Sequence, residues 1–289
     1  MLSEHGLQVA PSTYYERLSC PVSTAELADA WAANTLVDLY RANRGLYGVR
    51  KLWHAARRAG HPWGRDQVGR LMGIAGLDGV RRGRHRTVTT PREQTAPRHP
   101  DHCDRAWATP SRPDQWWVAD FTYVWTLAGF VYVSFVTDVY SRRILGWRVS
   151  CPKTTPLVSS ALEQALFTRR RGNAAFTATG LIHHSDAGSQ YRSLAFTEAL
   201  IEAGIAGSIG SVGDALDNAL MESTIGLFKT ELIDRQRSWT GRAQVEKETA
   251  AWVHWLNTDR LHSSIGYRPP VEFEDLYRHT TSTPALEVA

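Results

Sequence analysis

Three acidic residues that lie far apart in the chain carry the strongest potential for chemistry. Asp120 lies inside the apolar run WVADFTYV, Asp186 ends the run LIHHSD, and Glu222 follows 36 positions later. A carboxylate in an apolar strand is costly to bury unless it is paired or binds a cation. If the three meet, their oxygens would suit Mg²⁺ or Mn²⁺. Two such ions about 4 Å apart would activate water or a 3′-hydroxyl for phosphoryl transfer.

Each of these carboxylates also has a purely structural interpretation. A strand aspartate is more often a hydrogen-bonded turn or edge residue, and Asp186 before AGSQY could simply begin a turn. Asp138, in FVTDVYSR, competes with Asp120 for the strand position. We rank Asp138 lower because its surroundings are typical of a strand end that faces a turn.

The third carboxylate belongs to DALDNALMESTIGLFKTEL, residues 214–232, which is predicted to be helical. At about 100° per residue, Glu222 and Lys229 point within about 20° of each other, on a narrow polar stripe that includes Asn218. Two apolar faces flank this stripe: Leu216, Ala219, Leu220 and Leu227 on one, and Met221, Ile225, Phe228 and Leu232 on the other. A solvated surface stripe is the simplest alternative, and the helix alone favours it.

The sequence around these residues predicts an α/β domain. Aromatic and β-branched runs predict strands, and helical spacing predicts helices between them. The expected strands are 115–126, 129–141, 142–150, 180–186 and 205–209, and the expected helices are 156–171, 193–204, 214–232 and 243–257. The order βββαβαβα indicates an α/β sandwich on a mixed sheet. Asp186 would then lie at the carboxyl end of a strand, where such sheets place their sites.

The first part of the chain is predicted to be helical. Residues 24–43 form an amphipathic pattern with Thr24 as a plausible N-cap. Helices within 48–60 and 64–76 flank GHPWG, as in a helix-turn-helix. Its second helix would present three polar residues to DNA, and the adjoining RRGRHR would follow phosphates or a minor groove. The expected DNA contacts are Arg65, Gln67, Arg70, Arg81, Arg82 and Arg84. A small helical hairpin with solvated arginines is the alternative.

Bulk composition fits a protein that meets a polyanion. Of 289 residues, 43% are hydrophobic and 21% are charged, which is ordinary for a globular chain. The net charge of +4 is uneven, because residues 41–115 alone carry +10. No apolar run is long enough for a membrane span, and no secretory leader is expected. The scattered cysteines Cys20, Cys103 and Cys151 favour a reducing, cytoplasmic setting.

Composition also predicts the domain boundaries. We expect a helical DNA-binding region at 1–86, a Pro- and Thr-rich linker at 87–112, a catalytic core at 113–276 and a tail at 277–289.

Zinc is not expected, since His99, His102 and Cys103 lack a second cysteine pair at ligand spacing. Arg260 could reach a DNA phosphate, or could be an ordinary solvated turn residue.

A family resemblance rests on these same blocks. WVADFTYV, HHSDAGSQY and GDALDNALMESTIGLFKTEL resemble the three signature blocks of DDE transposases with an integrase core. The match is strongest to the second reading-frame product of the insertion-sequence-three family. Thirty-five residues separate Asp186 from Glu222, and Lys229 stands at the family's +7 position. GLYGVRKLWHAARRAG and LNTDRLHSSIGYRPPVEF also agree, so the resemblance covers about residues 11–275.

The resemblance implies a ribonuclease-H-like core with a mixed five-stranded sheet, in which Asp120, Asp186 and Glu222 hold two Mg²⁺ ions, with Mn²⁺ as a substitute. It implies metal-dependent cleavage and strand transfer at insertion-sequence ends, with Lys229 near the transposon end. The expected partners are terminal inverted repeats, target DNA, at least one further copy of the chain and an upstream-frame fusion partner. A nucleoid-associated location in a bacterial cytoplasm is also expected. Ala187 departs from the family, which often has arginine there.

Two other functions stay open on the sequence. The chain could be an inactive transposase remnant or repressor that only binds DNA. It could also be another nuclease on the same core, such as a ribonuclease H or a junction resolvase. Those nucleases need neither Lys229 nor the N-terminal helical region, so both features favour a transposase.

Overall fold

The fold is given by a computed structural model that describes residues 10–19, 22–81, 110–186, 188–209 and 219–282. The chain divides into two compact units, Met1–Val80 and Arg81–Ala289, each described by itself. Within the described ranges, no helix is long and apolar enough to cross a membrane.

The N-terminal unit is helical, as the sequence predicts. It contains α1 (Pro11–Ser19), α2 (Thr24–Ala42), α3 (Val49–Arg58) and α4 (Arg65–Ile74). The N-cap of α2 is Ser23 and not Thr24: its hydroxyl accepts the Glu26 N–H at 3.2 Å, and the Glu26 carboxylate accepts the Ser23 N–H at 2.8 Å. This capping box places the N-cap one residue before the predicted one, so that the helix begins at Thr24.

Helices α3 and α4 form the expected pair around a small core. Leu52 and Ala56 of α3 and Val68 and Leu71 of α4 are fully buried, together with Leu36 of α2. Their spacing of three or four residues puts each pair on one helical face.

The second unit is built on a five-stranded mixed sheet. Its strands are β1 (Trp116–Thr126), β2 (Gly129–Asp138), β3 (Ile144–Ser150), β4 (Ile182–Ser185) and β5 (Ala206–Ile209). The spatial order is β3-β2-β1-β4-β5. The first three strands form an antiparallel meander, while β4 runs parallel to both β1 and β5. The predicted mixed five-stranded sheet is confirmed.

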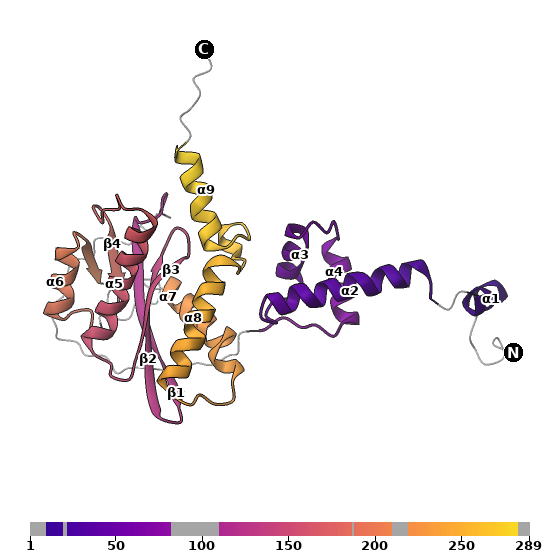
Figure 1. Ribbon diagram of the computed structural model, residues 1–289, viewed down its shortest axis with the longest axis horizontal. Coiled ribbons are helices and arrows are strands. Elements are labelled where there is room, and N and C mark those ends of the chain that lie inside the picture. Colours follow the sequence, from indigo (N-terminus) through magenta and orange to yellow (C-terminus); the bar gives the residue numbers. More distant parts are fainter. Residues whose placement is uncertain (1–9, 20–21, 82–109, 187, 210–218, 283–289) are drawn as a thin grey trace, which may run out of the picture. The chain divides into compact units, whose positions relative to one another are not determined.

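Helices cover both faces of this sheet, as Figure 1 shows for α5 and α6 on one side and α8 on the other. The helices are α5 (Thr155–Gly172), α6 (Leu194–Glu202), α7 (Ala219–Glu231) and α8 (Arg242–Thr258). Val136 of β2 packs in one core with α5 and α6. Its neighbour Phe135 lies with its ring centroid 5.1 Å from Phe228 of α7 and 6.1 Å from Trp252 of α8. Because successive strand residues face opposite sides, the two helix pairs cover opposite faces.

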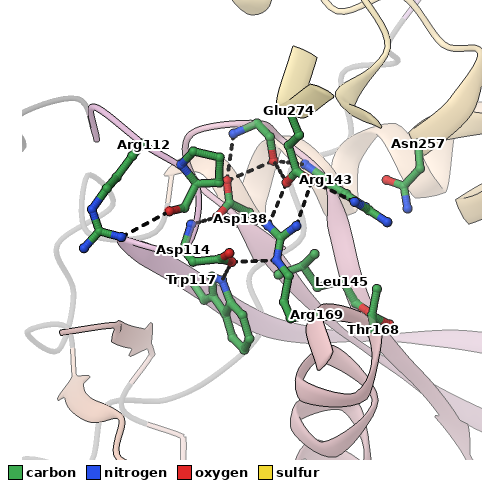
Figure 2. Close-up of polar contacts among 12 residues, drawn as sticks. Arg112, Asp114, Trp117, Asp138, Arg143, Leu145, Thr168, Arg169, Asn257 and Glu274 are labelled. Atoms are coloured by element: carbon green, nitrogen blue, oxygen red, sulfur yellow. Dashed lines mark hydrogen bonds and ion pairs between the residues drawn. The ribbon is translucent and has the colours of Figure 1, made fainter. Parts of the chain in front are cut away.

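The chain after α8 holds a helix that the sequence analysis does not anticipate. Two short 3₁₀ turns, η2 (Ile233–Arg235) and η3 (Ser263–Ile265), flank α8 in the sequence, and α9 (Pro270–Ser282) follows. Glu274 anchors α9: its carboxylate accepts hydrogen bonds at 2.7 Å from Arg143, Arg169 and the Ser141 hydroxyl. Figure 2 shows this buried network, which joins α9 to α5 and to the β2–β3 connection.

Candidate active site

The site begins where β1 and β4 separate. Their parallel ladder ends at the pair Ala119 and Ser185, so the next residue on each strand is an aspartate, Asp120 and Asp186. Paired strands lie about 4.8 Å apart, which brings these two positions side by side at the carboxyl end of β4. The end of a parallel pair is where α/β sheets place functional groups.

Asp120 is half-buried, and its surroundings disfavour its charge. Burial, followed by the negative charges of Asp186 and Glu222, raises its pKa to about 7. The Phe121 N–H, which donates to Asp120 Oδ1 at 2.7 Å, and the charge of Lys153 act in the opposite direction. The two other predicted acidic residues are therefore close enough to oppose the ionisation of Asp120.

Asp186 is exposed as a residue, yet desolvation of its carboxyl still raises its pKa. The Gly188 N–H opposes that shift by donating to Asp186 Oδ1 at 3.0 Å, and the charges of Lys153 and Arg192 oppose it as well. A Cβ at Gly188 would lie 2.9 Å from Asp186 Oδ1. A side chain at position 188 would therefore force the Asp186 carboxylate to shift.

Glu222 projects from the first turn of α7. Met221, Thr224 and Phe228 are buried beneath the helix, whereas Glu222 is exposed. The apolar face predicted around Met221 and Phe228 is thus the one that packs. The other predicted face is only partly covered, because Ala219 is exposed. Leu216 and Asn218 lie outside the described residues.

Lys229 lies on the last turn of α7 and contacts β1. Its Nζ is 5.0 Å from the centroid of the Tyr123 ring. Tyr123 is three residues beyond Asp120 on the same strand. Helix α7 therefore brings Glu222 and Lys229 to the part of β1 that extends past its pairing with β4.

Lys153 is a residue of this site that the sequence analysis does not single out. It lies between β3 and α5, with its Nζ 4.8 Å from the centroid of the Phe121 ring. Its charge lowers the pKa values of both Asp120 and Asp186. The available signal was composition: the chain has only four lysines beside 29 arginines, and two of the four lie at this site.

The structure corrects the interpretation of Arg260, which is neither a phosphate contact nor a solvated turn residue. The residue is only 4% exposed. The Nε atom donates to both carboxylate oxygens of Glu231 at 3.0 Å. Because a buried charge requires a partner, this pair joins the end of α7 to the chain after α8.

Asp138, the competitor of Asp120, has a structural role. Its carboxylate accepts the Ser141 N–H at 2.8 Å and the Asp114 N–H at 2.7 Å. Burial raises its pKa to about 6, although the charge of Arg169 acts against that shift. Its position at a strand end followed by a turn agrees with its lower ranking.

The expected DNA contacts of the N-terminal unit have mixed surroundings. Arg70 pairs with Asp29 of α2 at 2.6 and 2.8 Å, which places its guanidinium against another helix of the same unit. Arg65 is exposed and contacts Asp66 at 3.3 Å, and Gln67 and Arg81 are exposed. Arg82 and Arg84 lie outside the described residues, as do His99, His102 and Cys103.

The histidines beside Asp186 belong to the core. His183 is buried, and burial lowers its pKa to about 4. His184 is also buried, with Nδ1 3.0 Å from the Ser208 hydroxyl on β5. Both arrangements are typical of core histidines on a central strand.

The acidic residues fit a divalent cation by their chemistry. Asp120, Asp186 and Glu222 offer the hard carboxylate oxygens that Mg²⁺ prefers. The negative charges of Asp186 and Glu222 oppose the ionisation of Asp120, and a bound cation would offset this repulsion. Across the part of the chain that the structure describes, no three acidic, histidine or cysteine side chains form a ready-made metal site. Their role as ligands thus remains a prediction.

Comparison with known protein families places this arrangement in a class. Integrase core domain families match residues 110–215 and 203–270, and an HTH-like domain family matches residues 26–85. The mixed sheet that carries Asp120 and leads into Asp186 is therefore the core of an integrase-type protein. Among solved structures, the catalytic core domain of BIV integrase is 19% identical and covers 59% of this chain and 99% of that chain, with a TM-score of 0.44.

Full-length relatives identify the family. A Mycobacterium tuberculosis protein of insertion sequence element IS986/IS6110 is 45% identical over 96% of this chain and 99% of its own. The transposase for insertion sequence element IS629 from Shigella sonnei is 45% identical over 94% of this chain and 90% of its own. The chain belongs to the insertion-sequence-three family of transposases, in the DDE polynucleotidyl transferase superfamily.

Proposed function

We propose that Asp120, Asp186 and Glu222 are the acidic triad with which this transposase cuts and joins DNA at the ends of its insertion sequence. The observation that carries the proposal is the separation of β1 from β4, which puts two of these carboxylates side by side, with Glu222 close enough to raise the pKa of Asp120. The family supplies the reaction class.

The three carboxylates would hold two Mg²⁺ ions, or Mn²⁺ in their place. When bound, these ions supply activation of the attacking oxygen and neutralisation of the charge that develops on the phosphate. Asp120, within β1, and Asp186, directly after β4, would be ligands held by the sheet. Glu222, on a helix, provides a ligand whose approach depends on the packing of α7.

The reaction has two parts that share one site. Water first hydrolyses a phosphodiester at each end of the element and releases a 3′-hydroxyl. That hydroxyl then attacks a second phosphodiester, so that one P–O bond forms as another breaks. No covalent protein–DNA intermediate is needed, because both attacking groups are oxygens of water or DNA.

The substrates are the terminal inverted repeats and a target duplex. The HTH-like region, within residues 1–86, would recognise the repeats, and Lys229 would contact DNA beside the core at 113–276. Residues 87–112 would connect the two regions, and residues 277–289 would be a tail. Two ends must be held together, so we propose at least a dimer on DNA, associated with the bacterial nucleoid.

The replacement Glu222→Gln tests the triad. The neutral side chain should retain binding to the element's ends yet lower cleavage in Mg²⁺ by more than about 100-fold, since even an outer-shell partner of a metal ligand is worth 10- to 100-fold. The measurement is nicking of an end-containing duplex, with binding followed separately by gel shift.

The matched control is Glu198→Gln, which makes the same change on the exposed side of α6 and should leave cleavage intact. Full cleavage by the Glu222 variant would remove that residue from the triad. An intact duplex after incubation with the unmodified protein would instead indicate a remnant that only binds DNA.

A further inference from the structure

We propose that Lys153 is a second lysine of the site that binds the DNA backbone, by contacting a phosphate next to Asp120 and Asp186. The inference rests on the proposed function, because it assumes that DNA is cut at these carboxylates. It assigns a substrate contact to the connection between β3 and α5, which carries none of the family's signature blocks.

Lys153 contacts the residue that follows Asp120 and the segment that follows Asp186. Its positive charge lowers the pKa values of Asp120 on β1 and of Asp186 after β4. A cation that acts on both residues lies beside the point where the strands separate. A phosphodiester bound there would lie next to the ammonium group of Lys153 as well as to Asp120 and Asp186.

Two contacts hold Lys153 at this place. Its Nζ lies over the Phe121 ring at 4.8 Å, a distance at which the face of an aromatic ring attracts a cation. Its carbonyl oxygen accepts a hydrogen bond from Gln190 Nε2 at 3.3 Å, which ties the residue to the segment after Asp186. The side chain of Lys153 thus contacts β1, and its backbone contacts the segment after β4.

The ammonium group of Lys153 is available to an anion. The residue is exposed, and among the residues that the structure describes its ammonium forms no ion pair with a carboxylate. Its Nζ lies over an aromatic ring, which attracts a cation without occupying its hydrogen-bond donors. A lysine that only balanced Asp120 or Asp186 would instead form a direct ion pair.

A second lysine extends this surface along β1. Lys229 lies over Tyr123 as Lys153 lies over Phe121. Residues two apart on a strand face the same side about 7 Å apart, so the two rings that these lysines contact lie on one face of β1. Two point charges in a row suit a phosphate backbone, and a compact ammonium binds phosphate without the bidentate geometry of arginine.

The test compares Lys153→Gln with Lys153→Arg in the full chain, on a duplex that contains the element's end. The Gln variant should raise KM for cleavage about tenfold, the worth of one hydrogen bond to a charged group. In binding measured without added metal, the slope of log affinity against log salt should fall by about one. The Arg variant should stay near the unmodified protein in both measurements.

The control Lys247→Gln removes the same charge from an exposed position on α8 and should change neither quantity. If Lys153→Gln leaves both KM and the salt slope unchanged, or lowers only kcat, the phosphate contact is wrong. If Lys247→Gln gives the same loss, the effect is one of net charge and the proposal also fails. The proposed function fails separately, when the unmodified protein does not cut or when Glu222→Gln cuts equally well.

Discussion

At the scale of single residues, the surroundings of Asp120 disfavour the ionised form of its carboxyl. Asp120 has an ordinary pKa of 3.8 and a pKa of about 7 in the folded protein, because burial and two neighbouring carboxylates disfavour its charge. Below about pH 4 the Asp120 carboxyl is protonated in both the folded and the unfolded chain, so it does not lower the free energy of unfolding. The cost grows between about pH 4 and pH 7 and is complete above pH 7. Asp120 therefore destabilises the metal-free protein at neutral pH.

Replacing the Asp120 carboxylate should abolish cleavage and increase stability. We expect Asp120→Asn to abolish cleavage and to raise the free energy of unfolding by about 1 to 2 kcal/mol at pH 8 in a chelator, with a smaller gain at pH 5. Chemical unfolding followed by tryptophan fluorescence at both pH values would measure the change. The exposed Asp234→Asn, in η2, is the control and should show no such pH dependence. An equal gain at both pH values would show that ionisation of the Asp120 carboxyl is not the cause.

At the scale of elements, one buried carboxylate attaches the last described helix to the core. Glu274 of α9 is fully buried. Burial alone would raise its pKa, but hydrogen bonds and charge from Arg169, with the charge of Arg143, hold the pKa at about 2. Because the pKa of Glu274 is lower in the folded protein than its ordinary value of 4.5, its ionised carboxylate stabilises the fold above about pH 4.5. That contribution is lost as the pH falls towards 2.

The variant Glu274→Gln should therefore destabilise the catalytic unit most at neutral pH. The change removes the carboxylate that accepts two hydrogen bonds from buried Arg169 and leaves this arginine with Asp114 and Asp138 alone. Breaking a buried ion pair costs about 3 to 5 kcal/mol. The deficit in unfolding free energy should shrink as the pH falls from 4.5 towards 2. Glu272→Gln on the same helix, whose carboxylate lies 3.7 Å from Arg268 at the surface, should cost less than about 1 kcal/mol. Equal effects from the two variants would contradict the role given to the buried network.

At the scale of the whole molecule, the chain forms two units with separate cores, and we propose that one recognises DNA and the other carries out the chemistry. Leu36, Leu52 and Leu71 are fully buried within the N-terminal unit, and Phe135, Phe228 and Trp252 are fully buried within the catalytic unit. The surplus of positive charge lies in residues 41–115, and residues 116–289 carry a net charge of −2. This division predicts that each unit can fold and act by itself.

Two fragments would check that division. Residues 1–86 alone should bind end-containing DNA in preference to scrambled DNA, with affinity that falls steeply with salt because the contacts are made to phosphates. Residues 110–289 alone should fold and nick DNA in Mg²⁺ without preference for the end sequence. Gel shifts and nicking assays on matched duplexes would measure both properties. End-selective cutting by the second fragment would place recognition in the core instead.

Local pattern was enough to predict most of the elements. The alternating aromatic and β-branched residues of β1 and β2, the short strand before Asp186, and the helical spacing of α3 and α4 each reflect which face of an element is buried. That information lies within a few neighbouring residues, so a single sequence contains it. The acidic residues could be singled out for a similar reason, because Asp120 interrupts an apolar strand and needs an explanation where it stands.

The sequence by itself determined the order of the strands and helices, the three acidic candidates and the family to which they point. Tertiary structure alone decided that Arg260 is buried against Glu231, 29 positions away, and that Glu274 attaches α9 to Arg169 across 105 positions. It also decided that Lys153 lies beside Asp120 and Asp186. The physical reason is that burial and charge pairing depend on which distant segments meet, and no short-range periodicity encodes those contacts.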